Sequence, residues 1–203
     1  MRPGCRPRTQ NCKRGWPILN DWKLREAVHC LDNGGVIAYP TESVYGLGCD
    51  PLNPAAVMRL LRLKQRSPAK GLILIAADFG QLRPFVTPID QERMAPVLAT
   101  WPGPHTWVLP AAPGTPWWLT GRHDSLAVRV TAHPLAAALC RRRGAPLVST
   151  SANRSGHSAP RQALAARLAL LPAAADLVLH GSCGPGHRPT PIRDARSGAL
   201  LRA

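Results

Sequence analysis

Three short polar segments each follow an apolar stretch of the sequence, and their side chains are of the kinds that bind small anionic ligands. They are Thr-Glu-Ser at 41–43, the basic segment 64–70 and Ser-Thr-Ser-Ala-Asn at 149–153. In open α/β sheets, ligands collect where strands end. We therefore expect the three segments to meet around one common hollow.

The segment 41–43 offers two hydroxyls and a carboxylate, and it is followed by Gly46 and Gly48 in a turn-rich stretch. Thr41 and its neighbours suit the binding of a small polar ligand. The same residue types also form capped tight turns, so this pattern alone leaves both interpretations open.

The basic segment places Lys64 and Arg66 at the end of an apolar helical pattern, with Lys70 close behind. Three cations at such a position can clamp phosphates, because arginine binds them bidentately and lysine acts as a point charge. The alternative is that these cations simply stabilise the C-terminal end of a helix.

Ser149, Ser151 and Asn153 form a dense polar cluster after the apolar run 146–148. Hydroxyls and turn N–H groups at a strand end can cradle an anion, although an ordinary Ser/Thr turn has the same composition. Ser149 is not expected to be a hydrolase nucleophile, since no nucleophile elbow surrounds it. The P-loop and dinucleotide-binding glycine motifs are both missing, so a nucleotide site must be of another type.

Periodicity predicts the elements that must position these groups. Helices are expected over 21–33, 54–64, 90–100, 133–143 and 161–171, and strands over 36–39, 72–76, 107–109, 125–130, 146–148 and 177–179, with a hairpin within 192–201. Residues 41–50 and 181–191 are expected to be loops. Because helices and strands alternate, the sequence predicts one α/β or mixed α+β domain over 20–203.

Composition narrows the class of protein. The chain has 26 Lys+Arg against 11 Asp+Glu, a formal charge of +15, which favours polyanionic partners, although an arginine-rich coding bias gives the same excess. None of the six cysteines forms a C-x-x-C pair, so we expect reduced thiols in a cytoplasmic protein and no structural metal. Secretory and membrane-spanning patterns are absent.

Residues 1–19 contain five basic residues and no acidic one. We expect this segment to be a disordered basic leader, or an extension from a start codon placed too far upstream.

Taken in order, these segments resemble the YrdC/TsaC family of threonylcarbamoyl-AMP synthases, in its short bacterial form. The resemblance runs from about Leu24 to Arg202, and several long motifs in the right order are more specific than any one of them. The motifs are 36–48 (VIAYPTESVYGLG), 63–66 (LKQR), 70–75 (KGLILI), 101–104 (WPGP) with Thr106, 124–130 (DSLAVRV), 146–153 (PLVSTSAN) and 192–194 (IRD).

The resemblance implies a twisted mixed sheet, flanked by helices, around a concave basic cavity. It implies that ATP, L-threonine and bicarbonate yield threonylcarbamoyl-AMP and pyrophosphate, with Mg²⁺ accompanying the ATP. Downstream tRNA-threonylcarbamoyl transferase proteins then use the product on the adenosine beside the anticodon. The residues it implies for ATP are Lys64, Arg66, Thr106, Ser149, Ser151, Asn153, Thr190 and Arg202, with Lys64 and Arg66 catalytic, and those for threonine are Thr41 and Arg129.

Two positions depart from the family pattern. Ser67 intervenes between Arg66 and Pro68, which puts the local turn in doubt, and Thr190 stands where relatives usually have serine. Two other functions were weighed. An RNA-binding or ribosome-maturation protein fits the charge, and weak tRNA binding is compatible with the enzyme as well. A carbamoyl-transfer module of hydrogenase-maturation type would require zinc-binding cysteine pairs and a longer chain.

Overall fold

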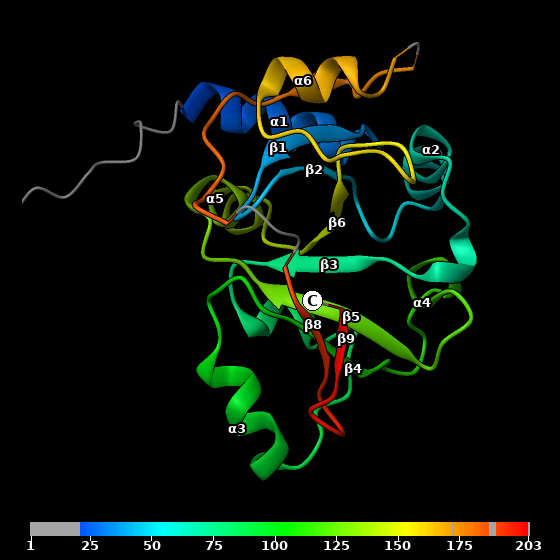
Figure 1. Cartoon of the computed structure of the whole chain (residues 1–203), viewed down its shortest axis with the longest axis vertical. Helices are drawn as coiled ribbons and strands as arrows, with labels where there is room; N and C mark the ends of the chain where they lie inside the picture. The colour runs from blue at the N-terminus through cyan, green and yellow to red at the C-terminus, as the bar shows by residue number, and fades with distance from the viewer. Residues whose placement is uncertain (1–20, 172, 187–189, 203) are drawn as a thin grey trace, which may run out of the picture.

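The computed structural model describes residues 21–171, 173–186 and 190–202. The leader expected at 1–19 lies outside these residues. Nine strands form one mixed sheet in the order β7-β1-β2-β6-β3-β5-β4-β8-β9 (Figure 1). Their bounds are β1 Ile37–Pro40, β2 Tyr45–Gly48, β3 Ile73–Ala76, β4 Thr106–Pro110, β5 Ser125–Val130, β6 Leu147–Ser151, β7 Leu177–Val178, β8 Ile192–Asp194 and β9 Leu200–Arg202.

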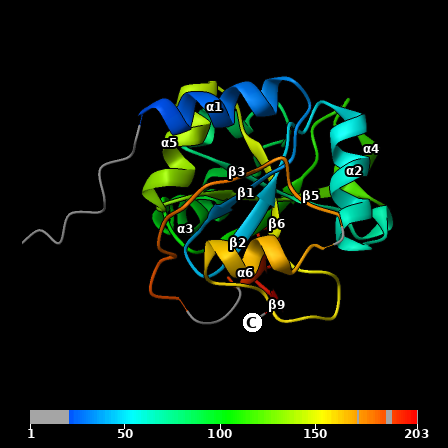
Figure 2. The same ribbon diagram turned by 90° about the horizontal axis from the view of Figure 1, so that it is seen from above.

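Helices cover the sheet from both sides (Figure 2). The α-helices are α1 Asp21–Asp32, α2 Pro54–Lys64, α3 Gln91–Ala99, α4 Trp117–Thr120, α5 Pro134–Arg143 and α6 Ala163–Leu168, and the 3₁₀ helices are η1 Pro68–Lys70 and η2 Phe79–Leu82. The single-domain mixed α/β fold expected from the sequence is therefore confirmed.

Strand β1 shows how alternation builds two cores. Ile37 and Tyr39 point toward α1 and α5, whereas Ala38 packs on the opposite side with residues of α2 and α6. Tyr39 and Ile37 are fully buried. Burying each such side chain contributes about 1.5–3 kcal/mol before entropy is counted, so the sheet is fixed by apolar contacts on both faces.

The strand register places the polar residues of interest on one face. Ser151 lies opposite Gly46, Ser149 lies opposite Ile73, and Arg129 lies opposite Ile75. Thr106 lies opposite Ile192, which in turn lies opposite Arg202. Since paired residues share a face of the sheet, these side chains project to the side that α1 and α5 cover only in part.

The five predicted helices and all predicted strands are present, with ends that differ by a few residues. Asn53 caps α2 by accepting from the Ala56 N–H, and Gly144 ends α5 in the left-handed conformation at φ 71°. The predicted helix 161–171 is shorter, Ala163–Leu168.

The loop predicted over 41–50 was wrong in part. Residues Tyr45–Gly48 form strand β2, which pairs with both β1 and β6 in the interior of the sheet. The glycines that suggested a turn are needed for close packing, because a Cβ on Gly48 would lie 2.7 Å from Tyr39 Cε1 and 2.8 Å from the Val148 carbonyl oxygen. Strand β6 continues past its predicted end at residue 148 and includes Ser149–Ser151.

Candidate active site

The open half of the sheet face forms the floor of a cavity of about 470 Å³. Ile73, Val108 and Ala127 lie on this floor, because they share the face that carries Ser149 and Arg129. Arg66 and Arg202, which are far apart in the sequence, line the same cavity. With Lys70, the arrangement joins an apolar surface to three cations, which suits a ligand with both an apolar and an anionic part.

Lys64 lies at the C-terminal end of α2 and is only 3% exposed. Its Nζ donates to the carbonyl oxygens of Ser151 and, at 2.7 Å, Asn153. Burial, and secondarily the charge of Arg66, lower the pKa of Lys64 from its ordinary value of 10.5 to about 8. Within the described part of the chain, this lysine contacts no carboxylate, which suits a residue that binds an anion.

The end of α2 turns the chain so that Lys64 and Arg66 flank a left-handed residue. Gln65 has φ 50° and ψ 47°, its N–H donates to the Arg62 carbonyl, and the Arg66 N–H donates to the Leu61 carbonyl. This pair of bonds is a Schellman motif, usually closed by glycine. A glutamine here accepts strain of about 1 kcal/mol, and the turn is rigid because it is hydrogen-bonded.

Arg66 continues from this turn, and its Nη2 donates to the Gly71 carbonyl at 3.0 Å. Its Nε is buried and has no hydrogen-bond partner among the residues that the structure describes. Ser67, the departure from the family pattern, caps the 3₁₀ helix η1 by accepting from the Ala69 N–H at 3.3 Å. Ser67 therefore forms part of a regular turn after the cations.

Three arginines converge where the C-terminal hairpin meets the sheet. Burial lowers the pKa of Arg202, and the nearby charges of Arg129 and Arg66 lower it further. The Nη2 of Arg202 donates to the Thr190 carbonyl at 3.0 Å, while Thr190 Oγ1 accepts from Arg129 Nη1 at 2.8 Å. Partly buried cations that repel each other call for an anionic ligand to compensate them.

Among the residues that the structure describes, Arg129 alone in this cluster has an acidic partner. Its Nη2 lies 3.4 Å from Glu42 Oε2, and both side chains are at most 10% exposed. Glu42 Oε1 accepts from Thr131 Oγ1 at 2.6 Å and from the Ala132 N–H at 3.1 Å. Burial tends to raise the pKa of Glu42, but Arg129 and the Thr131 hydroxyl hold it below its ordinary value. The carboxylate is thus ionised.

Thr41 and Ser149 approach each other across Gly46. A Cβ on Gly46 would lie 3.2 Å from Thr41 Cγ2 and 3.5 Å from Ser149 Oγ. The Thr41 hydroxyl donates to the Val44 carbonyl at 2.7 Å, so the capped turn that the sequence allowed is present, and both residues are nonetheless buried beside each other. Because Gly46 has no side chain, Thr41 and Ser149 can lie this close to each other.

A strap of residues 181–186 passes over the segment 41–43. The Gly184 N–H donates to the Thr41 carbonyl at 3.0 Å and the Gly186 N–H to the Glu42 carbonyl at 3.2 Å. Arg161 fastens the strap, because its guanidinium donates to the carbonyls of Ser43, Gly184 and Gly186. A Cβ on Gly184 would lie 2.5 Å from the Glu42 carbonyl oxygen, so the strap lies flat against the loop.

The contacts join the residues singled out from the sequence into neighbouring groups. Lys64 is joined to Ser151 and Asn153, Thr41 lies beside Ser149, and the last group contains Arg66, Thr106, Arg129, Thr190 and Arg202. Lys70 lines the cavity but is exposed, so it is not part of the buried cluster.

Sequence reasoning missed two residues of the site, the ion pair of Glu42 and the clasp of Arg161. Glu42 was seen only as one member of a polar loop, and Arg161 as the start of a helix. Since the partners of Glu42 lie 87–90 positions further along the chain, no local pattern could reveal them.

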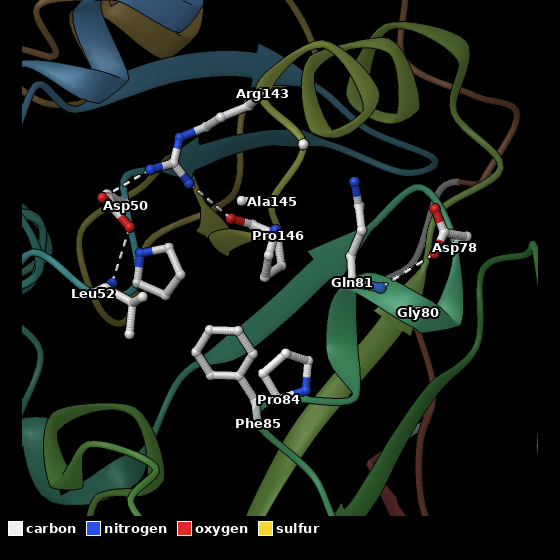
Figure 3. A pocket seen from close by; sticks show the side chains of 12 residues that line it. Asp50, Leu52, Asp78, Gly80, Gln81, Pro84, Phe85, Arg143, Ala145 and Pro146 are labelled. Atoms are coloured by element: carbon white, nitrogen blue, oxygen red, sulfur yellow. Dashed lines mark hydrogen bonds and ion pairs between the residues drawn. The ribbon is translucent and has the colours of Figure 1, made fainter.

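A second cavity, of about 510 Å³, lies at the other end of the strands (Figure 3). Its walls are largely apolar, with Leu52 and Phe85 among them. Its main cation, Arg143, is already paired with Asp50 at 2.7 Å and donates to the Pro146 carbonyl. The two cavities therefore differ in kind, because only the first combines apolar walls with unpaired cations.

Within residues 21–171, 173–186 and 190–202, no group of three or more His, Cys, Asp or Glu side chains is placed to hold a metal ion. In the same residues, no helix has the length and apolarity that crossing a bilayer requires. The fold and the site thus define an α/β domain with a cavity on an open sheet face, lined by apolar and cationic side chains.

The chain belongs to the Sua5/YciO/YrdC family, whose model, described as "Telomere recombination", matches residues 29–203. It is 53% identical over 179 residues to a threonylcarbamoyl-AMP synthase of Coxiella burnetii, covering 88% of this chain and 96% of the relative. It is 55% identical over 186 residues to the enzyme of the same name from Alkalilimnicola ehrlichii, covering 90% and 96%.

Two solved structures show the same fold. The crystal structure of P. abyssi Sua5 complexed with L-threonine has a TM-score of 0.83 and 33% identity, covering 90% of this chain. The present chain spans 54% of that Sua5 chain. The crystal structure of E. coli YciO has a TM-score of 0.78 and 27% identity, covering 90% of this chain and 89% of its own length.

Proposed function

We propose that this chain is a threonylcarbamoyl-AMP synthase, which converts ATP, L-threonine and bicarbonate into threonylcarbamoyl-AMP and pyrophosphate. The observation that carries the proposal is the grouping of Arg66, Arg129 and Arg202 at the open sheet face, where Glu42 is their one acidic partner among the described residues. Relatives that share more than half of their residues with this chain over almost their full length carry this name.

The cations suit the triphosphate half of the reaction. Lys64, Arg66 and Arg202 would bind phosphate oxygens, and the hydroxyls of Ser149 and Ser151 would bind phosphate or nucleoside groups. The remaining polar residues proposed for ATP are Thr106, Asn153 and Thr190. Phosphoryl and nucleotidyl transfer depend on positioning and charge compensation, so a site without a nucleophilic side chain is sufficient.

Threonine would bind at Thr41 and Arg129, beside the strap. The Sua5 structure from P. abyssi, 33% identical to this chain, is a complex with L-threonine, which supports an amino-acid half of the site here. The positive charge of Arg129 would attract the threonine carboxylate, while Thr190 and Glu42 hold its guanidinium in place.

The proposed reaction has two steps and needs no covalent enzyme intermediate. The threonine nitrogen forms a bond to the carbon of bicarbonate, water leaves, and the resulting carbamate carries the negative charge. A carbamate oxygen attacks the α-phosphorus of ATP, the bond from that phosphorus to the bridging oxygen breaks, and pyrophosphate leaves. Lys64 and Arg66 would stabilise the charge that develops on the phosphate oxygens.

Mg²⁺ is proposed to arrive with the nucleotide. Glu42 is engaged by Arg129 and Thr131, and no cluster of three candidate ligands occurs in the described part of the chain. The side chains therefore do not form a metal site of their own, and the phosphates and water would be the ligands.

The test is pyrophosphate release by the purified full chain with substrates omitted one at a time. Release that requires ATP, threonine and bicarbonate together is expected. Release that is unchanged when threonine is left out would overturn the assignment. Serine in place of threonine is a useful comparison, because it lacks only the methyl group.

Transfer of the product to downstream tRNA-threonylcarbamoyl transferase proteins, and weak binding of tRNA, are further parts of the proposal. The formal charge of +15 supports contact with RNA. Affinity for tRNA should fall steeply with added salt, because counterions are released from phosphates on binding. A tRNA affinity that stays the same between about 50 and 200 mM salt would contradict this role.

A further inference from the structure

We propose that Glu42 is a positioning residue, which holds Arg129 for the amino-acid substrate and confines the unpaired positive charge to the triphosphate half of the site. The inference rests on the proposed function and deepens it. It assigns a task to Glu42, which the sequence marked only as one member of the polar segment 41–43.

Hydrogen bonds fix both Glu42 and Arg129 in place. Glu42 is fixed by two hydrogen bonds to Oε1, from Thr131 Oγ1 at 2.6 Å and from the Ala132 N–H at 3.1 Å. This leaves Oε2 to face Arg129 Nη2 at 3.4 Å. Arg129 is held on its other side by Thr190 at 2.8 Å, so its guanidinium is fixed between a carboxylate and a hydroxyl.

The free oxygen of the Glu42 carboxylate is buried away from solvent. Glu42 Oε2 and Arg129 Nε are both buried, and neither has a hydrogen-bond partner in the described part of the chain. Atoms with so little exposed surface are out of reach of a substrate in this conformation. Glu42 therefore acts through Arg129 and does not itself touch a substrate.

The four cations of the site differ in the kind of partner that they have. Lys64 and Arg66 donate to backbone carbonyls, and so does Arg202, whereas Arg129 has a carboxylate. An uncompensated buried arginine would be repelled by its two arginine neighbours and would turn toward solvent. With Glu42 present, Arg129 stays in place and the excess positive charge remains where the phosphates bind.

The experiment is a double-mutant cycle with Glu42→Gln and Arg129→Met, read as kcat/KM for threonine and KM for ATP. Glutamine keeps the acceptor for Thr131 and Ala132 but removes the charge. We expect the KM for threonine to rise by about tenfold or more, and the KM for ATP to stay within about twofold. In the Arg129→Met background, Glu42→Gln should change kcat/KM for threonine by less than about twofold.

Independent effects of the two substitutions would overturn the proposal, and so would equal increases in both KM values, because a general loss of structure affects both substrates. Thr131→Val provides a milder second variant, which removes one hydrogen bond to Glu42 while keeping its charge. It should raise the KM for threonine alone, and an increase shared with ATP would again contradict the positioning role.

Glu92→Gln, on an exposed residue of α3, is the control with the same loss of charge, and it should leave both KM values unchanged. Wild-type turnover separates the two ideas. If the unaltered chain releases no threonine-dependent pyrophosphate, the proposed function fails. If it does so and the cycle is additive, only the role of Glu42 fails.

Discussion

The Nζ of Lys64 lies 2.7 Å from the carbonyl oxygen of Asn153, a residue 89 positions away in the sequence. This contact ties the end of α2 to the chain just beyond β6. A lysine has three donors. Two of them are used by backbone carbonyls, and the side-chain oxygens of Ser151 and Asn153 each lie 3.4 Å from the Nζ, so a ligand would displace these two longer contacts. The protein thus aims a buried charge by using its own backbone as the support.

Lys64→Met should lower kcat/KM for ATP by about 100-fold or more, because it removes a charged donor that would face the phosphates. The measurement is pyrophosphate release at saturating threonine. Arg62→Ala, an exposed charge on the same helix, is the matched control and should keep near-normal activity. Turnover close to wild type in Lys64→Met would exclude this residue from the phosphate site.

Affinity for ATP should weaken as the pH rises through about 8. Burial depresses the pKa of Lys64 to about 8, so the charged form that binds phosphate is depleted above that pH. If only the charged form binds, the apparent Kd should rise about fivefold between pH 8 and pH 9. Calorimetric titration over pH 7 to 9.5 provides the measurement.

The same titration with Lys64→Arg serves as the control for that pH dependence. Arginine stays charged over this range, so the inflection near pH 8 should disappear even if the affinity is lower. An inflection that persists would mean that another group is responsible.

Gln65→Gly should stabilise the fold by about 0.5–1 kcal/mol, because glycine adopts the left-handed conformation of this position without steric cost. Gln65 is the one non-glycine residue with positive φ among those described. Denaturant unfolding provides the measurement. Gln65→Ala should give no comparable gain, since alanine retains the Cβ. A destabilised glycine variant would show that the side chain matters more than the backbone.

Arg161→Ala should loosen the strap and cost about 1–3 kcal/mol of stability, because several carbonyl oxygens lose a charged donor. Limited proteolysis should then cut near residues 181–186 sooner than in the parent chain. Arg167→Ala, an exposed arginine of α6, is the control. Unchanged protection from protease would contradict the role assigned to the clasp.

Much of the fold could be predicted from local patterns. The periodic apolar residues of α1 and α5 and the six-residue strand Ser125–Val130 leave little choice of structure, and caps such as Asn53 mark the helix starts. The prediction that Arg129 points away from Val128 was also correct, since Val128 packs in the core while Arg129 faces the site.

Strand β2 could not be predicted in this way. Its two glycines have low strand propensity, and the segment is a strand because β1 and β6 lie on either side of it. The same reason explains why Glu42 was not seen as the partner of Arg129. Both depend on contacts between segments that are far apart in the chain.

Arg161 holds the strap 181–186 through backbone carbonyl groups, so most side chains of the strap are free to vary. Arg161 binds carbonyl oxygens, which every residue possesses, so Ser182, Cys183 and Pro185 can be exchanged without loss of the clasp itself. Gly184 and Gly186 are the exceptions, because a Cβ on Gly184 would lie 2.5 Å from the Glu42 carbonyl oxygen and a Cβ on Gly186 would lie 2.7 Å from Ser43 Oγ. A library of substitutions across 182–186 should therefore be intolerant at 184, restricted at 186 and permissive at the other three positions.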